Sequence, residues 1–159
     1  MESSFDVAIC GAGPGGAALA SILASRGIKI ALIERQSDFS KEFRGEGIMP
    51  SGYEALKDIG FDLEKINIPV QKNSAINVYY HGEHLIDVEP PFEDASVRWV
   101  SQPALLECII SSNQENKNFN FFRGHRVHDA IYEDGRVRGL RVVNTEMQFD
   151  IKAKVIIGF

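Results

Sequence analysis

Three glycines near the start of the chain have a spacing that can hold a phosphate. Gly11, Gly13 and Gly16 form a G-x-G-x-x-G pattern directly after an apolar run. The first glycine of this pattern permits a tight turn, the second lets the backbone approach a pyrophosphate, and the third lets a helix pack closely on a strand. The N–H groups and the dipole at the start of that helix favour a diphosphate. The predicted phosphate-binding loop consists of Gly11, Ala12, Gly13, Pro14, Gly15 and Gly16.

One acidic residue lies where a dinucleotide-binding protein needs a ribose acceptor. Glu34 ends the second apolar run, 29–34, and it follows the glycines by about twenty residues. A carboxylate here accepts hydrogen bonds from ribose hydroxyl groups and repels the 2′-phosphate of NADP. The glycines and Glu34 together predict a bound adenine dinucleotide other than NADP, and they do not distinguish NAD from FAD.

The elements that position these residues follow from the hydrophobic pattern. Apolar residues predict strands at 5–10 and 29–34, and the alanine- and leucine-rich segment 17–25 predicts a helix between them. Gly27 provides a C-terminal cap for this helix. A strand, a turn, a helix and a second strand make a βαβ unit, whose two strands we expect to be parallel.

The rest of the chain alternates between helical and strand-like patterns. We therefore predict an α/β fold: a Rossmann-like nucleotide-binding domain with a parallel sheet and an added β-hairpin or meander. The expected elements are a loop at 36–49, a helix at 50–60, a hairpin around 81–83 that ends at Pro90 and Pro91, a helix that begins at Ser101, and strands at 118–124, 126–144 (with a turn at Asp134-Gly135) and 152–159.

Composition excludes several classes of protein. The 159 residues suffice for one core, and the formal net charge of −5 gives no basic footprint for nucleic acid. The first apolar run is broken by glycines and Pro14, and Glu2 stands where a signal peptide is basic, so we expect neither a signal peptide nor a transmembrane segment. Cys10 and Cys108 are expected to be buried, unpaired thiols of a cytoplasmic protein.

The four histidines do not predict a metal site. His125 and His128 are three residues apart in a predicted strand, which places their side chains on opposite faces. His81 and His84 flank the predicted hairpin turn, and no cluster of Cys or Asp supplements either pair. We expect no bound metal and no hydrolytic triad.

Several further segments occur together and in a fixed order. Combined with the glycine pattern, they make the sequence resemble the FAD-dependent aromatic hydroxylases, the single-component monooxygenases typified by para-hydroxybenzoate hydroxylase. The resemblance covers nearly the whole chain, and the same fold occurs in flavin-dependent halogenases and geranylgeranyl reductases. The segments that carry it are Arg35 after the acid, "FRGEGIMPSGYEAL" at 43–56, "SQPALLECI" at 101–109, and "EDGRVRGLRV" before "AKVIIG".

The resemblance implies a role for each matching residue on the adenosine side of FAD. The loop 11–16 would hold the pyrophosphate, and Glu34 would bind the ribose of the adenosine. Arg35 would lie beside the adenine, and Val127 would contact the adenine through its backbone.

The resemblance also implies contacts on the flavin side. Arg44, followed by Gly45, would place its guanidinium near the ribityl-diphosphate chain. Gln102, at the start of its helix, would reach the diphosphate, where many relatives have arginine. Glu46 has no partner for acid–base chemistry and is interpreted as a charged loop residue, so the catalytic residues stay unknown.

In the enzymes that the sequence resembles, NAD(P)H reduces FAD and O₂ is used to hydroxylate a small, typically aromatic, substrate. These enzymes have several hundred residues and an Asp after the glycine that matches Gly158, where this chain has Phe159. We therefore expect an inactive N-terminal fragment with an incomplete FAD-binding domain, 1–74 and 101–159, and a substrate-domain hairpin, 75–100. An unpaired sheet edge predicts self-association.

Three alternatives stay open at this point. An FAD-dependent reductase of the geranylgeranyl type would pass a hydride to a lipid alkene, and a halogenase would share the same FAD domain. A non-enzymatic module would bind an adenine nucleotide without turnover. The sequence does not define the substrate, nor whether NADH or NADPH is the reductant.

Overall fold

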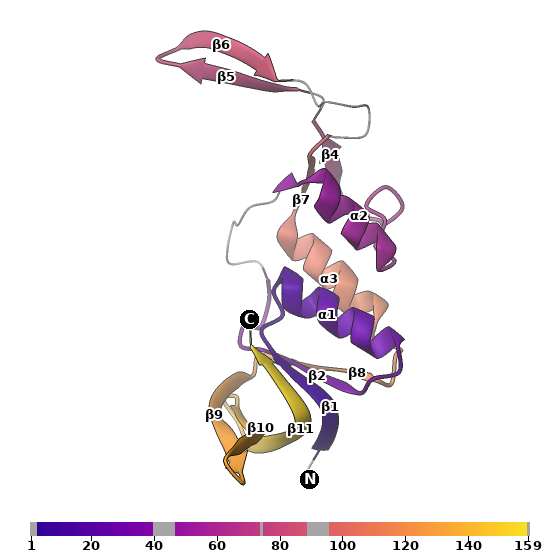
Figure 1. Cartoon of the computed structure of the whole chain (residues 1–159), viewed down its shortest axis with the longest axis vertical. Helices are drawn as coiled ribbons and strands as arrows, with labels where there is room; N and C mark the ends of the chain where they lie inside the picture. Colours follow the sequence, from indigo (N-terminus) through magenta and orange to yellow (C-terminus); the bar gives the residue numbers. More distant parts are fainter. Residues whose placement is uncertain (1–2, 40–46, 74, 89–95, 159) are drawn as a thin grey trace. The chain divides into compact units, whose positions relative to one another are not determined.

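The structure is a computed structural model that describes residues 3–39, 47–73, 75–88 and 96–158 (Figure 1). The chain forms two compact units. Unit 1 contains Met1–Glu42 and Leu106–Phe159, and unit 2 contains Phe43–Leu105.

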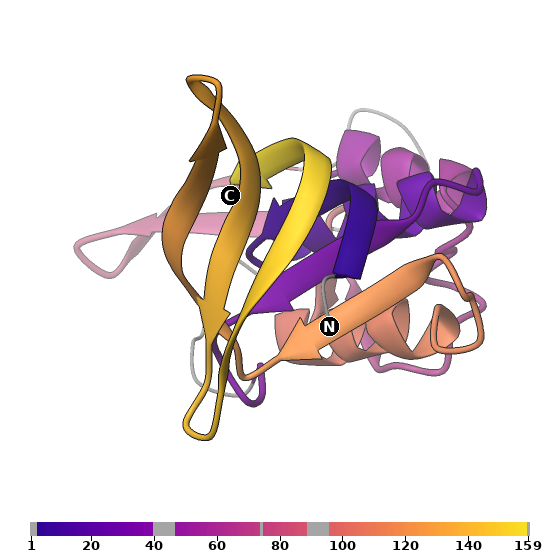
Figure 2. The same cartoon turned by 90° about the horizontal axis from the view of Figure 1, so that it is seen from below.

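Unit 1 is built on a six-stranded sheet. The strands are β1 (Ser3–Cys10), β2 (Ile30–Glu34), β8 (Phe119–Arg123), β9 (Arg126–Glu133), β10 (Arg136–Val143) and β11 (Gln148–Gly158), in the order β8-β2-β1-β11-β10-β9. β1 pairs in parallel with β2 and with β11, and β2 pairs in parallel with β8. β10 pairs antiparallel with β9 and β11, and Figure 2 shows these strands in orange to yellow. The parallel pairing confirms the predicted α/β fold class.

Helix α1 (Pro14–Ser25) joins β1 to β2 and packs on both strands. It begins three residues before the predicted helix, because Pro14 fits the first helical position, where its missing N–H is not needed. Its buried residues are small, among them Ala17, Ala20 and Ala24, so the helix can approach the sheet closely. Ile30 through Ile33 of β2 are all buried, as expected for a central parallel strand.

The packing of α1 on the parallel strands forms a first core, and a second core lies between the parallel strands and the antiparallel ones. Phe5, Ala8 and Ile33 from the parallel strands pack with Leu140 and Val142 of β10 and with residues of β11. The antiparallel strands therefore cover apolar side chains of the parallel strands with apolar side chains of their own. The turn between β9 and β10 is the predicted one, with positive φ at Asp134 (51°) and Gly135 (72°).

Unit 2 contains shorter elements. They are β3 (Gly47–Ile48), α2 (Pro50–Asp58), β4 (Val70–Lys72), β5 (Ile76–Tyr80), β6 (Glu83–Val88) and β7 (Arg98–Val100). β3, β7 and β4 form a three-stranded antiparallel sheet in that order. Helix α3 (Gln102–Ser112) follows β7. Its residues up to Leu105 belong to unit 2, and those from Leu106 onward belong to unit 1. In the described part of the chain, no helix is both long and apolar enough to span a membrane.

The hairpin β5–β6 forms where the sequence predicted it. His81 and Gly82 both have positive φ, 50° and 85°, which a two-residue turn of type I′ requires. The register pairs Val78 with Ile86 and Asn77 with Asp87, so these pairs lie on opposite faces. The hairpin is thus amphipathic, and every residue of β6 is exposed.

Three short strands were not predicted. β3 lies at the end of the segment 36–49, so the expectation of a loop there is wrong for Gly47 and Ile48. β4 and β7 are also absent from the prediction, because strands of three residues have too little periodicity to detect. Pro90 and Pro91 lie outside the described residues. The assignment of 75–100 to a separate substrate domain stays a prediction.

Candidate nucleotide-binding site

The chain turns from β1 into α1 through the predicted glycine loop. Gly11 has a φ of 103°, a left-handed conformation that favours glycine, and its N–H donates to the Ile33 carbonyl at 2.8 Å. Gly13 is the N-cap of α1, and no side chain among the described residues caps the helix. A Cβ at Gly13 would meet no described atom within 4 Å. Among the described residues, nothing therefore blocks the approach of a phosphate to the backbone at Gly13, as a dinucleotide requires.

The Glu34 carboxylate is oriented against this loop. Its Oε2 accepts a hydrogen bond from the Ala12 N–H at 2.8 Å, and its Oε1 accepts one from the Gln36 N–H at 2.9 Å. Each carboxylate oxygen can accept two hydrogen bonds, so both oxygens retain capacity for ribose hydroxyl groups. Glu34 and the glycine loop are thus held together by a direct hydrogen bond, which the spacing of the two motifs did not reveal.

Arg35 and Val127 belong to the same unit as Glu34. Arg35 is exposed directly after β2. Val127 lies in β9, one of the two edge strands of the sheet, and its side chain packs against the second core. A contact of Val127 with a ligand through its backbone is compatible with this orientation, and both roles stay predictions.

The remaining predicted site residues are less well defined. Gln102 is the first residue of α3, as predicted, and Ser101 Oγ accepts a long hydrogen bond of 3.5 Å from the Ala104 N–H. Gln102 belongs to unit 2 and the glycine loop to unit 1, so a shared phosphate contact stays a prediction. Arg44 and Gly45 lie outside the described residues, as does Glu46.

A cluster around Arg123 was missed by the sequence analysis. Arg123 ends β8, and in the parallel register it lies directly beside Glu34. Two of its guanidinium nitrogens each lie 2.7 Å from the Glu107 carboxylate, and this pairing raises the pKa of Arg123. The guanidinium also lies over the rings of Phe39 and Phe121, 4.9 and 5.1 Å from their centroids. Only the fold brings these residues together, because Arg123 and Glu107 are sixteen positions apart.

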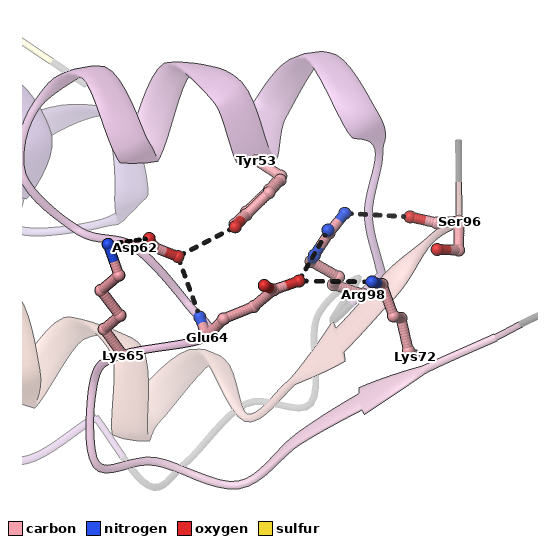
Figure 3. A network of polar contacts seen from close by, with 7 residues as sticks. All are labelled: Tyr53, Asp62, Glu64, Lys65, Lys72, Ser96 and Arg98. Carbon is pink, nitrogen blue, oxygen red and sulfur yellow. Dashed lines mark hydrogen bonds and ion pairs between the residues drawn. The ribbon is translucent and has the colours of Figure 1, made fainter. Parts of the chain in front are cut away.

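Unit 2 contains a polar network around a buried arginine (Figure 3). Arg98 is 2% exposed, and its guanidinium lies 3.5 Å from the centroid of the Tyr53 ring. Its Nη2 donates to Glu64 Oε1 at 3.0 Å and its Nη1 donates to the Ser96 carbonyl at 3.4 Å. Lys72 also pairs with Glu64, at 3.3 Å. The hydrogen bonds from Arg98 and Lys72 lower the pKa of Glu64.

The same network connects the elements that precede α3. The Tyr53 hydroxyl on α2 donates to Asp62 Oδ1 at 2.9 Å, which raises the pKa of Tyr53 and lowers that of Asp62. Lys65 pairs with Asp62 at 3.3 Å. α2, the segment 62–65 and β7 are therefore tied together, and β7 leads directly into Gln102.

The cysteines and histidines form no metal centre in the ranges that the structure describes. Cys10 and Cys108 are free and half-buried, and burial raises the pKa of both thiols. Half-burial is a correction to the expectation that both thiols are buried.

The fold and the site define a nucleotide-binding domain, and comparison with known proteins specifies its family. Residues 4–159 match the FAD binding domain family. The chain belongs to this family. FAD is therefore the cofactor, as predicted, and the open start of α1 together with the Glu34 carboxylate fits its diphosphate and ribose.

The similar proteins include enzymes whose names describe different reactions. The chain is 29% identical over 143 residues to a squalene monooxygenase from Candida glabrata, covering 89% of this chain and 27% of that protein. It is 22% identical to a digeranylgeranylglycerophospholipid reductase from Methanosarcina acetivorans, covering 99% of this chain and 38% of that protein. The p-nitrophenol 4-monooxygenase from Pseudomonas putida has the same fold, with a TM-score of 0.86 and 19% identity over 99% of this chain and 41% of that one.

These comparisons confirm the predicted relation to FAD-dependent monooxygenases. The chain spans 27% to 38% of the length of the two curated relatives. The names of the two curated relatives describe a monooxygenase and a reductase, so these relatives do not specify one reaction.

Proposed function

We propose that this chain is the FAD-binding part of a flavin-dependent monooxygenase that hydroxylates a small aromatic substrate with NAD(P)H and O₂. The observation that carries the proposal is the hydrogen bond from the Ala12 N–H to the Glu34 carboxylate, which joins the glycine loop, as the proposed phosphate site, to Glu34, as the proposed ribose acceptor. The names of two similar proteins, a squalene monooxygenase and a p-nitrophenol 4-monooxygenase, support the reaction class.

The residues of unit 1 would hold the adenosine half of FAD. The N–H groups of Gly15 and Gly16 would donate to the diphosphate at the start of α1. The free acceptor capacity of the Glu34 carboxylate would bind the ribose hydroxyl groups. Arg35 and the backbone of Val127 would lie against the adenine.

Other residues would hold the flavin half. Gln102 would donate to the diphosphate from the start of α3, and Arg44 with Gly45 would lie along the ribityl chain. When bound, FAD supplies the transfer of electrons from NAD(P)H to O₂, and the protein supplies binding and orientation.

The proposal assigns residues 75–100 to a substrate domain and 1–74 with 101–159 to the FAD-binding domain. The exposed apolar residues Val78, Ile86 and Val88 of the hairpin support this assignment, because such a surface needs a cover. By itself the chain is expected to be catalytically inactive. The two free cysteines favour a reducing compartment such as the cytoplasm.

The experiment is a visible absorption spectrum of the purified chain after incubation with FAD and removal of the excess. The proposal predicts retained flavin bands, and their absence both before and after incubation would contradict it. The same spectrum followed by NADH or NADPH oxidation in the presence of phenols, with a chain extended past Phe159, tests the reaction class.

A reductase is the second candidate. The likeness to a digeranylgeranylglycerophospholipid reductase favours it, since that enzyme's name describes reduction of a lipid. A flavin-loaded extended chain that reduces isoprenoid alkenes without consuming O₂ would decide for the reductase. Halogenation would instead require halide. Binding of ADP or NAD without FAD would indicate a non-enzymatic module.

A further inference from the structure

We propose that Arg123 is a positioning residue that holds the Glu34 carboxylate in the geometry needed for the ribose of the nucleotide. The ligand in this inference rests on the proposed function. Its structural part, that Arg123 fixes the segment 36–39 and through it the carboxylate, stands on the contacts of unit 1 alone.

The first step is the anchoring of Arg123 itself. Its bidentate pairing with Glu107 on α3 fixes the plane of the guanidinium. The rings of Phe39 and Phe121 stack at 6.5 Å with an interplanar angle of 14°, and the guanidinium lies within reach of both. Because Glu107 already neutralises its charge, Arg123 is suited to hold protein segments rather than to bind a phosphate.

The second step leads from Arg123 to the segment that follows Glu34. Arg123 Nη1 lies 3.4 Å from the Ser37 carbonyl, and the guanidinium covers the Phe39 ring. The backbone beyond Arg123 continues the same contact, with the Gly124 N–H donating to the Gln36 carbonyl at 3.2 Å and the His125 N–H to the Glu34 carbonyl at 2.8 Å. The segment 36–39 is thus held along its length.

The third step leads from this segment to the carboxylate. The Gln36 N–H donates to Glu34 Oε1, so the position of Gln36 determines the direction of the carboxylate. The other oxygen, Oε2, accepts the Ala12 N–H of the glycine loop. Loss of the Arg123 side-chain contacts would loosen Ser37 and Phe39, while the backbone bonds from Gly124 and His125 would remain. Because Gln36 adjoins the loosened residues, the two carboxylate bonds would then open more often.

The experiment combines residue-resolved amide hydrogen exchange without nucleotide and FAD titration of the same variants. Arg123→Met replaces the side chain by an unbranched, uncharged one and so removes the guanidinium that pairs with Glu107. We expect the Gln36 and Ala12 amides to exchange about tenfold faster, with core amides such as that of Leu32 unchanged, and the FAD Kd to rise about tenfold. Arg123→Lys is expected to fall in between, because it keeps the charge and loses the bidentate geometry.

The control is Arg136→Met, which changes an exposed arginine of β10 and is expected to leave both readouts unchanged. Wild-type protection of Gln36 and Ala12 in Arg123→Met would overturn the inference, as would an equal effect of Arg136→Met. If Arg123→Met does not fold, Glu107→Gln carries the test, and unchanged exchange there would overturn the inference too. If the wild-type chain binds no FAD, the proposed function fails, while amide exchange still decides the role of Arg123.

Discussion

Gly13 presents bare backbone where α1 begins. Its φ of −64° and ψ of 179° are accessible to any residue, so the conformation alone does not require glycine. A Cβ there would also meet no described atom within 4 Å, so neither backbone strain nor packing among the described residues requires glycine at this position. A ligand that approaches this backbone closely explains the glycine better than backbone strain does.

We predict that Gly13→Ala folds normally and binds FAD poorly. The methyl group would meet no described atom, so the free energy of unfolding should fall by only about 1 kcal/mol, because alanine is a poorer N-cap than glycine. FAD affinity should fall by about tenfold or more, because the methyl group occupies the approach of the diphosphate. Urea unfolding and fluorescence titration measure the two quantities.

Gly139→Ala provides the contrast. A Cβ there would lie 2.7 Å from the Ile151 carbonyl oxygen, so this variant should lose stability. Equal loss of stability in both variants, or full FAD affinity in Gly13→Ala, would contradict the interpretation of Gly13.

At the residue scale, the sequence predicts contacts that depend on local geometry. Glu34 could be identified because a strand of fixed length places its last side chain beside the glycine loop. The pairing of Arg123 with Glu107 could not be predicted, since it depends on how α3 packs against β8. The network around Arg98 joins three separate segments, and no local pattern indicates it.

At the element scale, Arg98 of β7 is the buried residue around which unit 2 packs. It can stabilise the unit through the charge of its guanidinium or through the packing of its side chain. The guanidinium is buried, yet its partner Glu64 is exposed over 53% of its side chain, which weakens the attraction. The Nε of Arg98 has no hydrogen-bond partner among the described residues. Desolvation therefore offsets much of the ion pair, and the packing on Tyr53 is expected to contribute more.

Two substitutions separate these contributions. Arg98→Met keeps most of the volume, and we expect it to change the free energy of unfolding by less than ~1 kcal/mol. Arg98→Ala removes the contact with Tyr53 and leaves a cavity, at a cost of about 2–4 kcal/mol. Chemical denaturation measures both, and a loss in Arg98→Met as large as that in Arg98→Ala would show that the charge dominates, because both variants remove the charge and only the second removes the bulk.

The pH dependence of stability tests the same network independently. The pKa of Glu64 in the folded chain lies below its ordinary value of 4.5, chiefly because of the hydrogen bond from Arg98. Its contribution to stability is therefore complete above pH 4.5 and is lost as the pH falls through the lower, folded-state pKa. We expect the stability difference between the wild type and Glu64→Gln to shrink below pH 4.5 in urea denaturation. A difference independent of pH would contradict this.

The elements themselves were predictable to different degrees. The βαβ unit, the hairpin β5–β6 and the turn at Asp134-Gly135 carry strong local signals, namely long apolar runs and residues suited to positive φ. β3, β4 and β7 carry none, because two or three residues cannot show a period and their pairing partners are distant in sequence.

For the molecule as a whole, the hairpin β5–β6 has an apolar face that the described residues do not cover. Val78 and Ile86 lie opposite each other on this face, and they are 38% and 55% exposed. A two-stranded hairpin is marginally stable by itself, so burial of this face would stabilise it. Self-association is one way to bury it.

We predict that the chain self-associates as its concentration rises and that Val78→Thr with Ile86→Thr weakens the association. Sedimentation velocity over a concentration series measures this. Tyr79→Ser, on the opposite face of the hairpin, is the control and should associate as the wild type does. A chain that stays monomeric throughout, or an equal effect of the control, would rule out this face as the contact.

The most direct test of the whole account is an equilibrium binding measurement of FAD with ADP and FMN as competitors. We expect the adenosine of FAD to bind to residues of unit 1 and its diphosphate to bind at the start of α1, with Gln102 of unit 2 as a further donor. FAD should therefore bind once per chain, and ADP should displace it. FMN, which lacks the adenosine, should not displace it, and Glu34→Gln should weaken FAD and ADP alike. Absence of binding, or displacement of FAD by FMN and not by ADP, would contradict the account.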